Sequence, residues 1–211
     1  NNIGVVYHSQ RNYNEALNYH QKALEIRLKF YGEEHPDVAT SYNNIGNTLF
    51  FQGKYAESLK THQKALKIRL QIYDESHSEI ARSYNNIGNV LERQGNYNDA
   101  LNYYQKALEI RLQVSGEMHP LYASTYNNIG NIYNIQRKYA EALNYYQKAL
   151  EIRLQILGES HPDVASSYNN IGHVYYSQGN CSDALNYHQK ALEIRLQNSE
   201  KNSKSIIRLY E

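Results

Sequence analysis

Apolar residues recur along the chain at the spacing of amphipathic helices, and the helical patterns come in pairs. In one such stretch the apolar positions follow at i, i+4, i+7 and i+11: Val38, Tyr42, Ile45 and Leu49. This spacing predicts a helix from about Pro36 to Gln52, and a second pattern predicts another from about Tyr55 to Ile72. Gly53 between them suits the left-handed conformation that ends a helix. No segment shows the alternation of a strand, so the fold class predicted is all-α.

The paired pattern repeats with a fixed period. The tetrapeptide "NNIG" occurs five times, 42 residues apart, beginning at Asn1, Asn43, Asn85, Asn127 and Asn169. A period of this length is typical of stacked repeats. We therefore predict one array, 1–211, of five repeats: 1–42, 43–84, 85–126, 127–168 and 169–210. The first helix is truncated at Asn1, and residues 204–211, after a candidate N-cap at Ser203, are expected to begin a further first helix that covers the fifth repeat.

Histidines recur at two places in the period. One set precedes the first helices: His35, His77, His119 and His161. Each lies in its own repeat without a second ligand at short spacing, so a loop or N-cap role is predicted rather than a metal site. Another set, His20, His62 and His188, takes an aromatic core position. We expect packed imidazoles there, which would make stability depend on pH.

A signature runs through each repeat, and in the fourth it reads Tyr126, Ile129, Gly130, Tyr133, Ala142, Tyr146 and Ala149. It resembles the tetratricopeptide repeat, in which Gly130 and Ala142 would let two helices approach closely. The proline that closes the usual unit of about 34 residues is missing, and the longer unit, "ALEIRLQILGESHPDVASSYNNIG", is similar to the repeats of kinesin light chain. This resemblance implies a right-handed α-solenoid whose inner groove, lined by first helices, binds extended peptides.

A helical wheel of the second repeat sets Asn44, Asn47 and Phe51 opposite the core, on the side that would face such a groove. Carboxamides can pair with the N–H and C=O groups of any peptide, whereas the variable ends would select side chains. The candidate peptide-binding residues are Asn2, Asn44, Asn47, Phe51, Arg82, Asn86, Asn89, Arg93, Asn128, Asn131, Ile135, Asn170 and His173. Phe51 and Ile135 would take apolar groups and the arginines acidic ones. The predicted partner is an extended, mildly acidic peptide with one or two apolar anchors.

Two explanations of the paired asparagines remain open. Asn44 and its equivalents could serve the groove, or repeat duplication could have copied them without use. For Asn43 and its equivalents, at the flank of the helix, hydrogen bonding between repeats is favoured.

Composition narrows the function. The 22 basic and 21 acidic residues give a net charge of +1, so no overall field favours nucleic acid or a membrane surface. A single cysteine, Cys181, fits a reducing, cytoplasmic location, and no apolar run could span a bilayer.

No catalytic, cofactor or metal constellation is present. The predicted function is a non-enzymatic scaffold or adaptor. The alternative is a sensor or autoinhibitory region of a larger NTPase-linked signalling protein, and an engineered consensus array also stays open.

Overall fold

The computed structural model describes residues 1–115 and 120–210, with side chains within 1–112 and 122–199. The chain divides into two compact units, unit 1 (Asn1–Val114) and unit 2 (Ser115–Glu211). The regular secondary structure of the described residues is entirely helical: α1 (Asn2–Ser9), α2 (Tyr13–Tyr31), α3 (Pro36–Phe51), α4 (Tyr55–Ile72), α5 (Ser78–Arg93), α6 (Tyr97–Ser115), α7 (Pro120–Ile135), α8 (Tyr139–Leu157), α9 (Pro162–Ser177) and α10 (Cys181–Tyr210). The predicted all-α class is confirmed.

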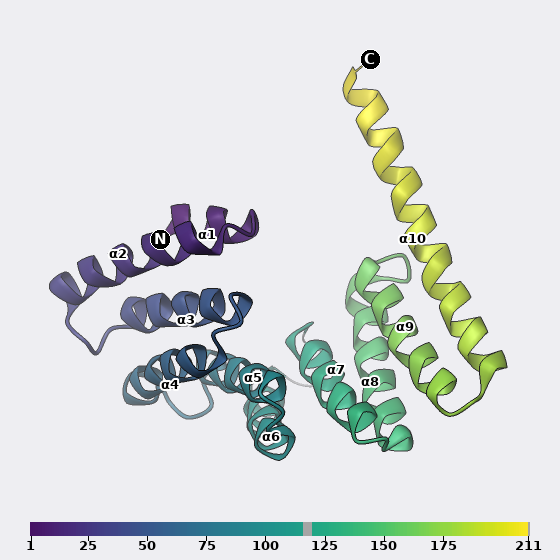
Figure 1. The fold of residues 1–211 in the computed structure, drawn as a ribbon, viewed down its shortest axis with the longest axis horizontal. Helices are drawn as coiled ribbons and strands as arrows, with labels where there is room; N and C mark the ends of the chain where they lie inside the picture. Colours follow the sequence, from purple (N-terminus) through teal and green to yellow (C-terminus); the bar gives the residue numbers. More distant parts are fainter. Residues whose placement is uncertain (116–119, 211) are drawn as a thin grey trace. The chain divides into compact units, whose positions relative to one another are not determined.

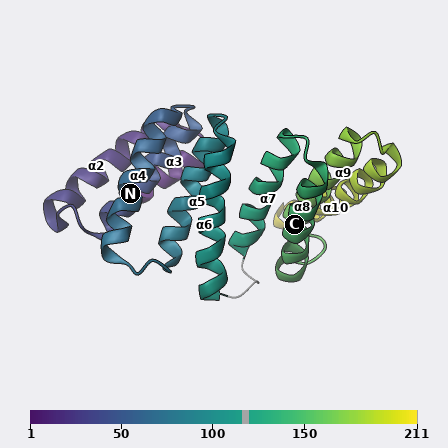
Figure 2. The same cartoon turned by 90° about the horizontal axis from the view of Figure 1, so that it is seen from below.

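Helices pack as hairpins, and hairpins stack within each unit. In unit 1, α1 packs on α2 and α3 on α4, while α2–α3 and α4–α5 contacts join successive hairpins (Figure 1). In unit 2, α7 packs on α8 and α9 on α10, and α8 joins the two hairpins through α9 (Figure 2). A hairpin alone would leave one apolar side open, so stacking supplies the buried core.

The helix ends follow local sequence signals. The imidazole Nδ1 of the residue before a first helix accepts the N–H two residues on, in three described caps: His35 from Asp37 at 3.1 Å, His77 from Glu79 at 3.2 Å and His161 from Asp163 at 3.1 Å. These bonds satisfy an N–H that the helix itself leaves unpaired. The N-cap role is confirmed for these three histidines, whereas His119 lies outside the described residues.

The turn between the two helices of a repeat uses a left-handed residue. Gly53 has φ of 77°, as predicted. Arg11 and Arg137 occupy the equivalent position in repeats one and four, with φ of 60° and 59°. An L residue with a side chain is strained in this region, so these two turns hold a conformation that glycine adopts readily.

Glycine inside the first helix allows the second helix to come close. A Cβ added to Gly46 would lie 2.7 Å from the His62 ring, and one added to Gly130 would lie 2.8 Å from the Tyr146 ring. Ala142 is fully buried in the same core cluster as Tyr146. The predicted close approach is therefore confirmed at Gly130, because no side chain fits between the helices there.

Within each unit, a recurring arginine joins one hairpin to the next. Arg69 on α4, whose side chain is 1% exposed, forms an ion pair with Glu79 on α5 at 2.7 Å. It also donates to the hydroxyl of Ser83 at 2.6 Å. Arg153 on α8 makes the matching bond to Ser167 on α9, also at 2.6 Å. Charge-assisted bonds of this kind are among the stronger ones in proteins, so they fix how hairpins stack.

The end of the chain differs from the prediction. α10 runs without a break from Cys181 to Tyr210, where a separate partial helix over 204–211 was expected. The segment aligned with the "GESHP" linker of the preceding repeat is "EKNSK", which lacks its glycine, its proline and its capping histidine. The aligned linker after α4, "DESHS", also lacks glycine and proline, but it keeps His77 as the cap of the next helix, and α4 ends at Ile72. Without the histidine cap as well, the helix continues through the serine at 203.

Candidate functional site

The paired asparagines link neighbouring first helices. The second asparagine donates from Nδ2 to Oδ1 of the first asparagine one repeat earlier, in three described pairs: Asn44 to Asn1 at 3.2 Å, Asn86 to Asn43 at 2.8 Å and Asn170 to Asn127 at 2.6 Å. Asn43 is only 5% exposed. The expected role of Asn43 between repeats is confirmed, and each bridge fixes two adjacent first helices side by side.

These bridges show that Asn44 and its equivalents have a partner within the protein. Asn44, Asn86 and Asn170 are half-buried rather than open, and they reach toward the preceding repeat. A carboxamide has two N–H donors and a carbonyl acceptor, and the bridge takes one donor. The rest of the amide can still meet a ligand, so the groove role of this series stays a prediction.

The next asparagine along the first helix has a different partner. Asn89 and Asn131 accept hydrogen bonds at Oδ1 from the hydroxyls of Tyr104 and Tyr146, at 2.8 and 2.7 Å. Each tyrosine belongs to the second helix of the same repeat. The wheel placed these asparagines opposite the core, but a long tyrosine beside a glycine reaches around to them. This link was not predicted, although the separation of 15 residues in both repeats was visible in the sequence.

The apolar candidates are exposed at the ends of their helices. Phe51 is 55% exposed and Ile135 is 52% exposed. The Phe51 ring stacks on Tyr13 with centroids 5.6 Å apart and meets His8 edge-on at 5.1 Å. In unit 1, therefore, the predicted apolar anchor is the outer member of an aromatic cluster of Phe51, Tyr13 and His8.

The two arginine candidates are not equivalent. Arg82 pairs with Glu79, which also pairs with Arg69. Arg93 is exposed, donates to the Tyr55 hydroxyl at 3.3 Å and lies 6.0 Å from the centre of that ring. Because a neighbouring carboxylate already compensates Arg82, Arg93 is the better candidate for an acidic group.

The remaining candidates are distributed over both units. Asn2, on unit 1, and His173, on unit 2, are exposed, whereas Asn47 and Asn128 are half-buried. Unit 1 carries Asn2, Asn44, Asn47, Phe51, Arg82, Asn86, Asn89 and Arg93, and unit 2 carries Asn128, Asn131, Ile135, Asn170 and His173. Each unit thus presents its own row of amides with an exposed apolar side chain at one end.

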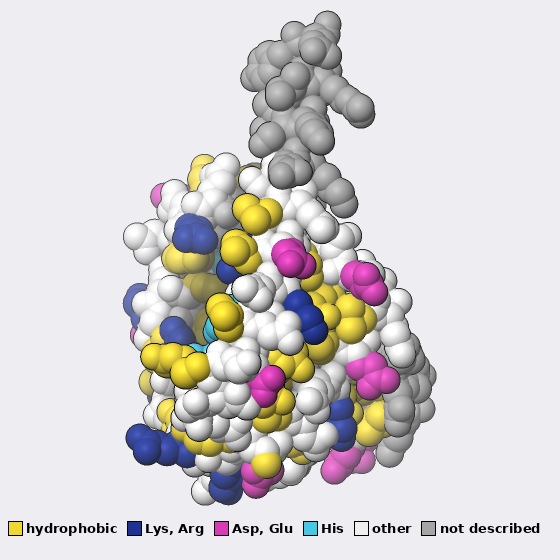
Figure 3. Space-filling model, turned by 90° about the vertical axis from the view of Figure 1, so that its right-hand side faces the viewer, with side chains coloured by type: hydrophobic (Ala, Val, Ile, Leu, Met, Phe, Trp, Pro, Cys, Tyr) yellow, Lys and Arg dark blue, Asp and Glu magenta, His cyan; other side chains and the backbone are white. Residues whose placement is uncertain are grey.

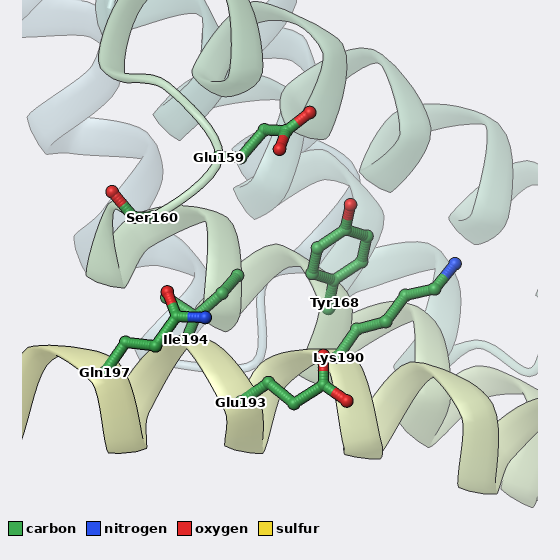
Figure 4. A pocket seen from close by; sticks show the side chains of 7 residues that line it. All are labelled: Glu159, Ser160, Tyr168, Lys190, Glu193, Ile194 and Gln197. Carbon is green, nitrogen blue, oxygen red and sulfur yellow. The ribbon is translucent and has the colours of Figure 1, made fainter.

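Three similar hollows of the surface lie away from these rows. In unit 2, a cavity of about 550 Å³ opens between the loop before α9, α9 itself and α10 (Figure 4), lined by Glu159, Ser160, Tyr168, Lys190, Glu193, Ile194 and Gln197. In unit 1, equivalent cavities of about 260 and 490 Å³ occur beside Tyr42 and Tyr84. They contain none of the predicted site residues, and in each a lysine lies over the tyrosine ring, at 5.5 to 5.8 Å from its centre.

The charges and ligand-forming side chains are dispersed. Among the described residues, no three His, Cys, Asp or Glu side chains gather as a metal site, and no helix is long and apolar enough to cross a bilayer. On the face shown in Figure 3, basic and acidic side chains are interspersed with hydrophobic ones. This face has no single-signed patch of the kind that binds nucleic acid.

Comparison with known sequences identifies the repeats. The tetratricopeptide repeat pattern matches residues 1–71, 37–113, 79–153 and 121–197. The chain belongs to the tetratricopeptide repeat family. No curated protein is similar enough in sequence to count as a relative of this tetratricopeptide repeat chain.

Solved structures share the fold. BtubC (BKLC) from P. vanneervenii has a TM-score of 0.80 at 24% identity, over 93% of this chain and 78% of that one. The nearly identical repeats of a kinesin light chain-type protein from Podosopora anserina give 0.75 at 16% identity, over 93% of both chains. MamA gives 0.62 at 19% identity, over 94% of this tetratricopeptide repeat chain and 97% of that one. The resemblance to kinesin light chain-like repeats is confirmed at the level of fold, and repeats of this family generally mediate protein interactions.

Proposed function

We propose that this tetratricopeptide repeat chain is a non-enzymatic adaptor whose first helices bind an extended peptide of a partner protein. The observation that carries the proposal is the row of half-buried amides held in place by bridges between repeats. Amides that are already fixed lose little conformational entropy on binding. They also pair with main-chain groups, which every peptide carries.

The side chains around the rows suggest the partner's composition. In unit 1, the exposed Phe51 ring would take an apolar anchor and Arg93 a carboxylate of the peptide. In unit 2, Ile135 would take a second anchor. The proposed ligand is therefore extended and mildly acidic, with one or two apolar residues. A cytoplasmic location, suggested by the single cysteine, belongs to the same proposal. No observation among the described residues favours a sensor or autoinhibitory region.

The test is an array of peptides in which acidic content and the number of apolar residues vary independently. Peptides that bind the 211-residue chain are then measured by fluorescence anisotropy against Asn86→Ala and Asn43→Ala. Both variants break the same bridge between α3 and α5, but only the first removes an amide of the predicted groove. We expect Asn86→Ala to weaken binding by about tenfold, the order of one or two lost hydrogen bonds, and Asn43→Ala to weaken it by about threefold at most.

Equal losses in the two variants would assign the asparagine to the architecture alone. An array on which no mildly acidic, anchored peptide binds better than scrambled neutral ones would overturn the proposed function.

A further inference from the structure

We propose that Tyr146 is a positioning residue that makes repeat four a hydrogen-bond donor site for a main-chain carbonyl oxygen of the bound peptide. The proposal rests on the proposed function, and it assigns a role to a side chain of the second helix that lies outside the predicted groove residues. The group presented to the peptide is the amino end of Asn131. Tyr146 decides which end of that amide is presented.

Tyr146 packs beside a glycine, and from there its hydroxyl reaches Asn131. The ring is buried and packs on Gly130, where an added Cβ would lie 2.8 Å from ring carbons. From there the hydroxyl donates to Oδ1 of Asn131 at 2.7 Å. Asn131 directly follows Gly130 on α7 and is half-buried. The carbonyl end of this amide is therefore held toward the protein, and its amino end points away from the hydroxyl.

The asparagines three residues earlier on the first helices use the other end of the amide, the amino end, within the protein. Asn86 on α5 and Asn170 on α9 donate from Nδ2 in the bridges to the preceding repeat. Their carbonyl oxygens are not used in those bridges. One position of the row thus favours accepting from a ligand and the other favours donating to it. An extended peptide alternates N–H and C=O groups along its edge, which matches such a row.

Repeat two supplies the contrast within the same chain. His62 stands where repeat four has Tyr146, and it packs on Gly46 in the same way. An imidazole has no hydroxyl beyond its ring, and among the described residues the Nδ1 atom of His62 has no hydrogen-bond partner. No described bond from His62 orients Asn47, the counterpart of Asn131. Asn47 can therefore turn either end toward a ligand.

The decisive experiment is a double-mutant cycle between Tyr146→Phe and the ligand backbone. The probe is the tightest-binding peptide of the array, made as a series with one thioamide per molecule and a second series with one N-methyl group per molecule. A thioamide sulfur accepts hydrogen bonds poorly, whereas N-methylation removes only the peptide's own donor. We expect one thioamide position to weaken binding to the wild-type chain by about tenfold and to Tyr146→Phe by less than about twofold. N-methylation of the residue that carries that carbonyl should have no comparable effect.

Two further variants keep the test independent of folding. Asn131→Asp keeps an acceptor for the Tyr146 hydroxyl but has no N–H, so it should fold normally and lose the thioamide-sensitive contact. His62→Tyr places a hydroxyl opposite Gly46, where repeats three and four show that tyrosine fits beside glycine. It should orient Asn47 and create a second thioamide-sensitive position.

Thioamide penalties that are the same in the wild-type chain and in Tyr146→Phe would overturn the inference, because the hydroxyl would then have no part in recognition. A penalty that follows N-methylation would also overturn it, since Asn131 would be presenting its carbonyl end. Both outcomes leave peptide binding intact. Failure of every array peptide to bind would instead overturn the proposed function, and with it the carbonyl site.

Discussion

Repeats two and four place a ring against a glycine in the same way, yet they treat its polar atoms differently. His62 is 1% exposed beside Gly46, and burial together with the nearby Arg69 charge lowers its pKa to about 4. Tyr146 beside Gly130 sends its hydroxyl to Asn131. The fit of the two helices tolerates either ring. What the choice changes is the response to acid and the orientation of a surface amide.

The largest expected effect concerns acid stability. The pKa of His62 is lowered from 6.5 to about 4 in the folded state, so the unfolded chain binds a proton more readily between these values. The contribution of neutral His62 to the free energy of unfolding is therefore fully present above pH 6.5, and it is lost as the pH falls from 6.5 through 4. The shift corresponds to a loss of about 3 kcal/mol at most. Hydrogen exchange of α3 and α4 across this range measures it.

His62→Tyr is the matched variant for this prediction, because it keeps an aromatic ring and removes the titration. Burial also lowers the pKa of His20 to about 4, so the acid response should concentrate in unit 1. In unit 2 the corresponding His188 is exposed. Equal acid sensitivity of α3–α4 in the wild-type chain and in His62→Tyr would show that another group is responsible.

Alanine at the three glycines tests whether the ring contacts are equally tight. An added Cβ would lie 2.7 Å from His62 at Gly46 and 2.8 Å from Tyr146 at Gly130, but 3.0 Å from the exposed His188 at Gly172. We expect Gly46→Ala and Gly130→Ala to destabilise by about 2 kcal/mol through overpacking. Gly172→Ala should cost less than about 1 kcal/mol, because alanine favours the helix and the ring can move.

Urea unfolding of the three variants, compared with the wild-type chain, provides the measurement. A cost at Gly172 as large as that at Gly130 would mean that the aromatic ring does not set the limit, and that the helix backbones themselves collide.

The smallest expected effect concerns the turn that enters the second helix. Repeat four makes it with Arg137 at φ of 59°, whereas repeat two uses Gly53 at φ of 77°. Arg137→Gly should relieve left-handed strain, offset by the larger entropy of the unfolded chain, for a net gain of about 0.5 kcal/mol. Thermal unfolding detects the gain, and Gly53→Arg should shift the midpoint the other way. A midpoint for Arg137→Gly below that of the wild-type chain would show that the arginine makes a compensating contact.

Much of this architecture could be predicted because local sequence encodes it. The helix from Tyr55 to Ile72 has the predicted limits, and the caps at His35 and His77 depend only on residues two positions away. The left-handed turn at Gly53 likewise depends only on the glycine itself. Signals of this kind are complete within a few residues, so a single repeat is enough to recognise them.

The surface was harder to predict because its polar groups pair across helices. A helical wheel describes one helix in isolation, so it set Asn44 opposite the core, although Asn44 bonds to Asn1 in the preceding repeat. It also gave no sign that Tyr146 reaches Asn131. The predicted break near Ser203 was wrong for a related reason: alignment to the period carried over a helix start whose histidine cap is missing there.

The asparagine bridges give the array a rule for changing length. In the three described bridges, one repeat supplies the carbonyl oxygen and the next repeat supplies the N–H, between residues 43 apart. Removing or inserting a whole period brings an identical donor to an identical acceptor, so the junction closes as before. A cut of any other length would set unlike side chains against each other. Genes for such a chain can therefore lengthen or shorten by unequal exchange and still encode a continuous stack.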